Sequence, residues 1–410
     1  MKIGIYISGL GQSFTAESVE KYAGRLMNEM RFNSTEVKYE LKTEKVSYSE
    51  NRESSVVSII EKNGKEQRVV YKIYDFKYHE ILTERFKSYS LILKNLCLFL
   101  LVIQKFPLMI KRLFLPASYS RPFQTLYLFV IFMVIAGAIL FMLPGVLNVV
   151  IDNTPDKLGI KASIFDFMEI YGIHDIPYIT KAGITKFSSF IIPITTLLLL
   201  IVPNANTLLA NLATEFVCAN DYMQYGTQRQ LLQGNIERLV NYISEDSQNN
   251  DGDDCQIHFH TYSFGSILAL DYIYPYCDTI TANAEKFCKA IITIGTPFEF
   301  IKSYYPSFYQ NRIIGLGNKL CWINIYSIAD ALATNFRYDA KRGDAQFGLD
   351  QKSKKPININ YEVAPLNTGG VINFLMLYSI KAHGVYWDPK TEGQSCLGLI
   401  YDEMKKEKLL

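Results

Sequence analysis

CQIHFHTYSFGSILALDYIYP, residues 255–275, predicts a strand, a sharp turn and a helix in direct succession. Residues 256–260 have the character of a buried strand, and the small and apolar residues that follow Gly265 favour a helix. Ser263 stands at the turn between them. Such a turn lifts a serine hydroxyl above the sheet and needs a small residue two positions later, which Gly265 supplies. The stretch therefore predicts an α/β fold with Ser263 as a candidate nucleophile.

The predicted helix also offers Ser263 an electrostatic partner. Free N–H groups and the helix dipole at a helix N-terminus stabilise an oxyanion, so the N–H of Phe264 is a candidate donor. Thr261 occupies the position two before the serine, where such turns usually have glycine. A serine followed by this spacing is a weak signal alone, so the rest of the chain has to support it.

Apolar periodicity predicts the elements on either side of this stretch. Residues 2–8 are expected to form a buried strand, and Asn63-Gly64 is typical of a hairpin loop. The polar run 247–254 is expected to be a surface loop. Further predictions are a helix at 15–30, strands at 36–47, 54–62 and 67–75, and an amphipathic helix at about 211–244.

The histidines are few enough to be considered singly. Only His383 follows both the candidate serine and the candidate acids in the chain, and we predict that it is the catalytic base. His258 and His260 are two apart on one predicted strand, so they share a sheet face, where core or surface histidines are more common than metal ligands. His174 lies between two long apolar runs, and His79 is an alternative base.

The candidate acid is Asp330, at the end of a predicted strand that begins at Trp322. Its competitors are Asp339, Asp344 and Glu299. Asp330 also has a purely structural interpretation as the N-cap of a helix that would begin at Ala331.

Several motifs together resemble the lipase-like branch of the α/β-hydrolase fold. Gly9-Leu10-Gly11 follows the first strand and is similar to the family's His-Gly-Leu-Gly loop, with Ser8 at the histidine position. Similar features are the Gly-Thr-Pro turn at 295–297, the strand and acid at 322–330, and the histidine loop at 382–387. The resemblance covers about residues 1–30, 67–80 and 211–390. It implies a triad of Ser263, Asp330 and His383, with the N–H groups of Leu10 and Phe264 as the oxyanion hole.

Two uncharged apolar runs interrupt these motifs. Residues 125–150 and 187–209 are each long enough to cross a hydrocarbon core, which takes about 20 apolar residues. Residues 90–103 are shorter and contain Lys94 and Asn95, so a helix at the membrane surface is expected there, with a third span as the alternative. Basic residues between 105 and 121 precede the first run, so the positive-inside rule places the flanking parts in the cytoplasm.

These observations predict an α/β-hydrolase-type, mostly parallel sheet flanked by helices, with an inserted transmembrane helical hairpin. Residues 1–88 and 211–410 would form the two parts of the hydrolase domain, and residues 89–210 the membrane insertion. The protein would then be a multi-pass membrane protein with its catalytic domain facing the cytoplasm.

Composition narrows the possible functions. The 410-residue chain has a net charge of +2, which gives no reason to expect nucleic acid as a partner. Its seven cysteines are scattered and form no Cys-x-x-Cys pair, so neither a disulfide framework nor a zinc site is predicted. Phe14 stands where a dinucleotide-binding loop starting at Gly9 would need its third glycine. No cofactor or metal is expected.

The function expected from these observations is a membrane-anchored serine hydrolase that cleaves acyl esters of lipids, as a lipase or phospholipase does. Membrane lipid would be both substrate and environment, and the oligomeric state is left open. A protein or acyl thioesterase is one alternative, and a catalytically inactive membrane scaffold or pore-forming protein is another.

Overall fold

The computed structural model describes residues 1–10, 18–34, 37–64, 66–89, 91–114, 217–251, 255–276, 281–339, 341–362 and 382–410. The chain divides into two units. One comprises Met1–Arg85, Leu108–Tyr127 and Cys218–Leu410, and the other comprises Phe86–Pro107 and Leu128–Val217. The described part of the first unit contains the sheet and all the candidate site residues.

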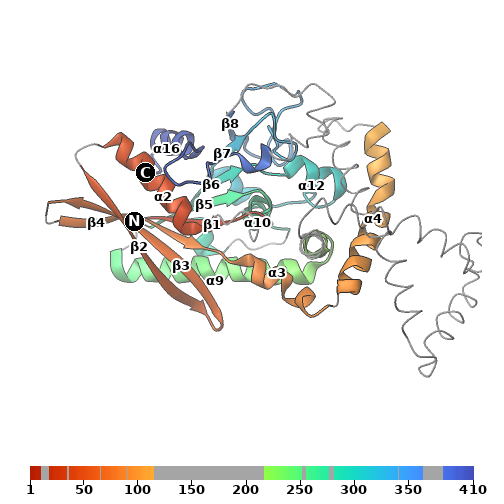
Figure 1. The fold of residues 1–410 in the computed structure, drawn as a ribbon, viewed down its shortest axis with the longest axis horizontal. Helices are drawn as coiled ribbons and strands as arrows, with labels where there is room; N and C mark the ends of the chain where they lie inside the picture. The colour runs from red at the N-terminus through yellow and green to blue at the C-terminus, as the bar shows by residue number, and fades with distance from the viewer. Residues whose placement is uncertain are drawn as a thin grey trace, which may run out of the picture. The chain divides into compact units, whose positions relative to one another are not determined.

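An eight-stranded mixed sheet is the centre of the first unit (Figure 1). Its strand order is β2-β3-β4-β1-β5-β6-β7-β8. All neighbours from β4 to β8 are parallel, whereas β2, β3 and β4 pair antiparallel. The bounds are β1 Lys2–Ile7, β2 Lys38–Ser49, β3 Arg52–Asn63, β4 Glu66–Asp75, β5 Gln256–Tyr262, β6 Cys288–Ile294, β7 Cys321–Tyr326 and β8 Ile357–Asn360.

Helices cover both faces of this sheet. Helices α2 (Val19–Asn33) and α16 (Leu397–Lys406) pack against one face in a shared apolar cluster. Helices α9 (Gly226–Asp251) and α10 (Phe264–Ile273) contact each other and lie against the other face, as Figure 1 shows for α2 and α9. Further helices of the described unit include α3 (Tyr78–Lys87), α11 (Ala282–Phe287), α12 (Phe298–Tyr304), α13 (Gly315–Lys319) and η3 (Ala382–Gly384).

The strands and turns predicted near the N-terminus are confirmed to within a few residues. Gly64 adopts a φ of +61° in the hairpin between β3 and β4, which explains why glycine follows Asn63 there. Helix α9 runs through Asp251, so the loop predicted at 247–254 is wrong for its first five residues. Polar residues do not end a helix by themselves, because most have only a modest propensity penalty.

The transmembrane part of the fold prediction is contradicted. Within the described ranges, no helix is long and apolar enough to cross a membrane. The prediction of an inserted transmembrane hairpin, and with it that of a multi-pass membrane location, is therefore wrong. The two runs on which these predictions rested, 125–150 and 187–209, lie outside the described residues, as does His174. The physical reason for the error is that hydropathy along a sequence does not by itself distinguish a spanning helix from another apolar segment.

A single helix occupies the segment for which a membrane-surface helix was expected. Helix α4 extends from Leu91 to Phe114, beyond the predicted end at 103, and contains Pro107. The division into 1–88, 89–210 and 211–410 stays a prediction.

Candidate active site

Ser263 occupies a strained turn between β5 and α10. Its backbone has φ 52° and ψ −123°, a conformation that residues other than glycine rarely adopt. Its N–H donates to the carbonyl of Ile294 at 2.9 Å, which joins the turn to the neighbouring strand. A Cβ at Gly265 would collide with the carbonyl oxygens of Ile7 and Ser8, so only glycine fits there. The predicted strand–turn–helix geometry is confirmed, although Ser263 is buried at 9% exposure.

Thr261 fits the position where a glycine is usual. Its side chain is fully buried and its Oγ1 lies 2.8 Å from the carbonyl oxygen of Ile292 and 3.0 Å from Oγ of Ser266. A hydroxyl has one hydrogen, so Thr261 donates to the carbonyl and accepts from Ser266. The larger side chain is therefore accommodated with its polar atom satisfied.

His383 links the serine to Asp330. Its Nε2 lies 2.8 Å from Ser263 Oγ and its Nδ1 lies 2.8 Å from Asp330 Oδ2. A carboxylate only accepts hydrogen bonds, so Nδ1 donates and Nε2 is left to accept from the serine hydroxyl. The structure thus brings together three predicted residues that are separated by 120 and 53 positions in the chain.

Asp330 is fully buried and its two oxygens accept three hydrogen bonds. Oδ1 accepts the N–H of Leu332 at 2.8 Å, and Oδ2 accepts the hydroxyl of Tyr386 at 2.8 Å as well as His383. Tyr386 in turn accepts the N–H of Ser327 at 3.2 Å. Sequence reasoning missed this role of Tyr386, which depends on a contact with a residue 56 positions away.

The competing acids are placed elsewhere in the described structure. Asp339 forms an ion pair with Arg337 at 2.7 Å, the backbone carbonyl of Asp344 accepts from Arg337 at 2.8 Å, and the backbone N–H of Glu299 donates to Thr334 at 2.9 Å. No helix begins at Ala331, so the N-cap interpretation is wrong. Asp330 does accept a hydrogen bond from the backbone N–H of Leu332.

Aromatic rings and a glycine shape the space around the imidazole. The ring of Tyr262 stacks on His383 with centroids 5.3 Å apart, and its hydroxyl donates to the His383 carbonyl. Gly295 has a φ of +58°, and a Cβ there would lie 2.9 Å from the Tyr386 ring and 3.2 Å from His383. The glycine of the Gly-Thr-Pro turn therefore allows both rings to approach.

The backbone after β1 passes across the serine. A Cβ on Gly9 would lie 2.9 Å from Ser263 Cβ, so the chain leading to Leu10 runs beside the nucleophile. Phe264 is the first residue of α10, where backbone N–H groups have no partner within the helix. These positions suit the expected oxyanion hole, whose two donors stay a prediction.

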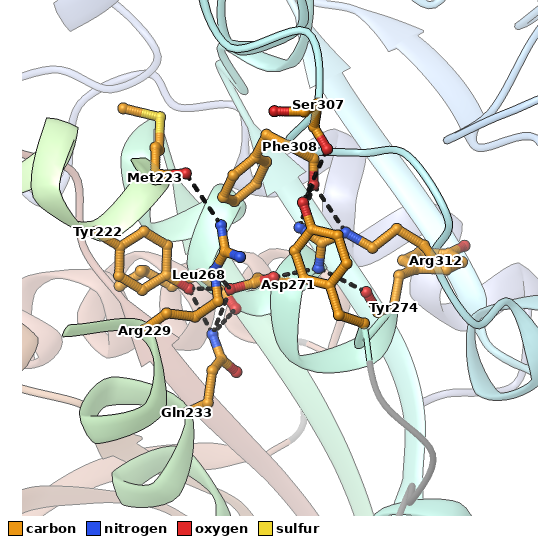
Figure 2. Close-up of polar contacts among 11 residues, drawn as sticks. Tyr222, Met223, Arg229, Gln233, Leu268, Asp271, Tyr274, Ser307, Phe308 and Arg312 are labelled. Atoms are coloured by element: carbon orange, nitrogen blue, oxygen red, sulfur yellow. Dashed lines mark hydrogen bonds and ion pairs between the residues drawn. The ribbon is translucent and has the colours of Figure 1, made fainter. Parts of the chain in front are cut away.

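A buried ion cluster holds α10, the helix that follows Ser263 (Figure 2). Asp271 of α10 accepts hydrogen bonds from Arg312, Gln233 and Tyr222, and Arg229 approaches it at 3.2 Å. The side chains of Asp271 and Arg312 are only 2% and 1% exposed. A cavity of about 360 Å³ beside this cluster is lined by Arg229, Gln233 and Asp271 among others, and none of the Ser263–His383–Asp330 residues lines it.

The other described histidines have structural partners. Tyr71 OH bridges Nδ1 of His258 and Nε2 of His260, each at 2.8 Å, in the buried face against α2. Burial lowers the pKa of His260 to about 3, so it stays neutral. His79, the alternative base, contacts the carbonyl oxygen of Gly9, whereas His383 contacts Ser263. Among the described residues, no group of three or more acidic, histidine or cysteine side chains could hold a metal ion.

Ser263, Gly295, Asp330 and Gly9 all follow the carboxyl ends of parallel strands, the edge at which open α/β sheets bind ligands. A serine, an imidazole and a buried carboxylate in one hydrogen-bonded line at this edge form the arrangement that nucleophilic acyl transfer requires. No protein-family model, curated protein or solved structure was found to match the chain. The functional proposal therefore depends on the geometry of the site.

Proposed function

We propose that the protein is a serine hydrolase that cleaves carboxylic acyl esters. The observation that carries the proposal is the continuous line of hydrogen bonds from Ser263 Oγ through His383 to Asp330. The strained φ of Ser263 supports it, because strain of about 1–3 kcal/mol persists at functional sites where the surroundings enforce it.

The proposed reaction has two halves. Ser263 Oγ attacks the ester carbonyl carbon while its proton passes to His383 Nε2, and Asp330 stabilises the imidazolium that forms. The tetrahedral oxyanion then collapses, the C–O bond to the alcohol breaks, and the alcohol leaves with the proton from His383. Water adds to the acyl-enzyme in the same way, giving the free acid and restoring the serine hydroxyl.

Aromatic rings surround the triad, and we propose that the site accepts an apolar acyl group. Tyr262 and Tyr386 flank His383, and Phe264 follows the serine. Each buried methylene of an acyl chain contributes about 0.8 kcal/mol of binding. We therefore propose that the substrate is a lipid acyl ester, and turnover should rise with acyl length before it saturates.

Covalent labelling tests the nucleophile. A fluorophosphonate probe should label the wild-type protein and leave Ser263→Ala unlabelled, with the folded state intact. Ser266→Ala is the matched control, because Ser266 lies three residues away on the same helix and is fully buried. Equal labelling of wild type and Ser263→Ala would sink the proposal, and an unlabelled wild type would support an inactive scaffold.

A substrate series tests the ester class. The rates at which the protein hydrolyses nitrophenyl esters from acetate to palmitate, glycerolipids and matched acyl thioesters are measured and compared. Faster turnover of acetate and butyrate than of long-chain esters would contradict the lipid substrate. Preferential cleavage of thioesters by unlabelled protein, together with fluorophosphonate labelling at Ser263 in a separate sample, would indicate a thioesterase that uses the same residues.

A further inference from the structure

His79 is a buried histidine outside the Ser263–His383–Asp330 line, and its ring contacts the backbone that follows β1. Nε2 lies 2.9 Å from the carbonyl oxygen of Gly9, with Ser8 Oγ at 3.5 Å. Burial lowers the pKa of His79 to about 4, so its ring is neutral near pH 7 and has one N–H. Because a carbonyl oxygen only accepts, that hydrogen is on Nε2.

The sheet explains why His79 reaches this place. Strands β4 and β1 are parallel, with Asp75 opposite Tyr6, and the N–H of Phe76 donates to the Tyr6 carbonyl at 2.9 Å. The segments that follow β1 and β4 therefore both leave the sheet at the carboxyl ends of its parallel strands. Helix α3 begins three residues after Asp75, and the His79 ring stacks on Tyr78 with centroids 4.2 Å apart.

The carbonyl of Gly9 and the N–H of Leu10 belong to one peptide group. A peptide group is planar, and in the trans form its C=O and N–H point in opposite directions. No cis peptide bond occurs in the described chain. A hydrogen bond that holds the Gly9 oxygen therefore also sets the direction in which the Leu10 N–H points.

This peptide begins at Gly9, which lies close to the nucleophile. A Cβ on Gly9 would lie 2.9 Å from Ser263 Cβ and 3.0 Å from the Tyr262 ring. Glycine is flexible in the absence of a restraint, so an unrestrained Gly9 would let the peptide rotate. His79 Nε2 donates to the carbonyl oxygen of this peptide group, on the side opposite its N–H.

We propose that His79 is a positioning residue for the oxyanion hole: by donating to the Gly9 carbonyl it holds the Gly9–Leu10 peptide so that the Leu10 N–H meets the developing oxyanion. This inference rests on the proposed function, because an oxyanion hole matters only in acyl transfer. His79 contacts the backbone carbonyl of Gly9, so it acts through the backbone.

The test compares three variants of the full-length protein on a nitrophenyl ester. His79→Ala removes the ring, His79→Leu keeps an apolar side chain without a donor, and His79→Gln returns an N–H near the position of Nε2. Thr83→Ala is the control, because Thr83 lies on the same helix and bonds only the His79 carbonyl at 2.7 Å. Thermal midpoints and inhibition by a trifluoromethyl ketone, which forms a bound oxyanion, are measured alongside.

His79→Leu and His79→Ala should lower kcat about 10- to 100-fold with KM within about twofold, because the lost interaction exists mainly in the transition state. The trifluoromethyl ketone should weaken in parallel, and His79→Gln should recover most of kcat. Where His79→Ala does not fold, the Gln and Leu variants decide the question.

An unchanged kcat in His79→Leu, or equal losses in the Gln and Leu variants, would overturn the inference while leaving the proposed function intact. A wild-type protein that neither turns over esters nor reacts with fluorophosphonate would overturn both.

Discussion

Tyr386 supports the buried acid through a single hydroxyl. It donates to Asp330 Oδ2 and accepts from the Ser327 N–H, so it connects the histidine loop to the end of β7. Burial raises the pKa of the Tyr386 hydroxyl well above its ordinary value, which keeps it protonated as a donor. A buried carboxylate is stable only when its lone pairs have such partners.

Tyr386→Phe tests this support. Removing the hydroxyl leaves the Ser327 N–H without its acceptor and takes one of three donors from Asp330. Each unsatisfied buried group costs about 1–3 kcal/mol, so the free energy of unfolding should fall by about that amount. We expect kcat/KM for an ester to fall about 3- to 10-fold, because Asp330 orients His383 less firmly.

Tyr361→Phe is the matched control for this variant. Tyr361 stacks on Tyr386 with centroids 6.3 Å apart, and its hydroxyl lies outside the Asp330 network. Wild-type kinetics and stability in Tyr386→Phe would show that the hydroxyl contributes nothing to the acid.

At the scale of elements, α10 is held at both of its ends. Ser263 and Gly265 fix its start against β1 and β6, whereas Asp271 fixes its last turn through Arg312, Arg229 and Tyr222 (Figure 2). The guanidinium group of Arg312 also lies 3.8 Å from the centre of the Tyr276 ring, a cation–π contact. A nucleophile at the start of a rigid helix is held in a reproducible position.

Asp271→Asn should destabilise the first unit strongly. The substitution preserves the shape but removes the Asp271 charge from the buried guanidinium group of Arg312 and from the partly buried one of Arg229. Breaking a buried pair costs about 3–5 kcal/mol. Urea denaturation followed by tryptophan fluorescence measures this loss, because both tryptophans, Trp322 and Trp387, lie in that unit.

Asp246→Asn is the corresponding control on α9. Asp246 pairs with Lys72 at 3.8 Å and its side chain is 31% exposed, so its removal should cost less than about 1 kcal/mol. Similar losses in the two variants would show that the Asp271 cluster is no stronger than a surface ion pair.

At the scale of the whole molecule, buried neutral histidines should make stability depend on pH. Burial lowers the pKa of His79 to about 4 and of His260 to about 3, and it lowers that of His258 as well. The unfolded chain binds protons at these histidines below about pH 6.5, whereas the folded protein does not. Their contribution to stability is therefore complete above about pH 6.5 and is lost as the pH falls toward the folded values.

Asp75 opposes this effect. Burial raises its pKa to about 7, so the folded protein takes up a proton that the unfolded chain binds only near pH 4. Burial also raises the pKa of Glu29, which opposes the histidines in the same direction as Asp75. Three histidines against Asp75 alone leave a net difference of about two protons, which corresponds to about 2.7 kcal/mol per pH unit as an upper value.

Urea titrations between pH 6 and pH 4.5 should therefore show a steep loss of stability. His79→Gln removes one of the three histidines and should reduce the slope by about one proton, or about 1.4 kcal/mol per pH unit. A free energy of unfolding that is constant across this range would contradict the assignment of buried neutral histidines.

Local patterns along the chain were enough for the elements nearest the candidate nucleophile. Short-range rules govern the turn at Asn63-Gly64 and the strand–turn–helix around Ser263, because φ preferences and side-chain alternation act over a few residues. The order of serine, acid and histidine was expected for another reason, namely the resemblance of their motifs to the α/β-hydrolase family. The hydrophobic runs show the limit of such patterns, because apolar composition alone led to transmembrane helices that the described structure contradicts.

Only the tertiary structure decided which groups meet. Asp330 was the expected acid, with Asp339, Asp344 and Glu299 as its competitors, and only the structure shows that Asp330 lies within hydrogen-bond distance of His383. The contact of His79 with Gly9 spans 70 positions, and that of Arg312 with Asp271 spans 41. Such contacts depend on strand order and helix packing, which bring distant segments together in the tertiary structure. The sequence by itself determined the local geometry of the serine, whereas its partners followed from the way the parallel strands pair.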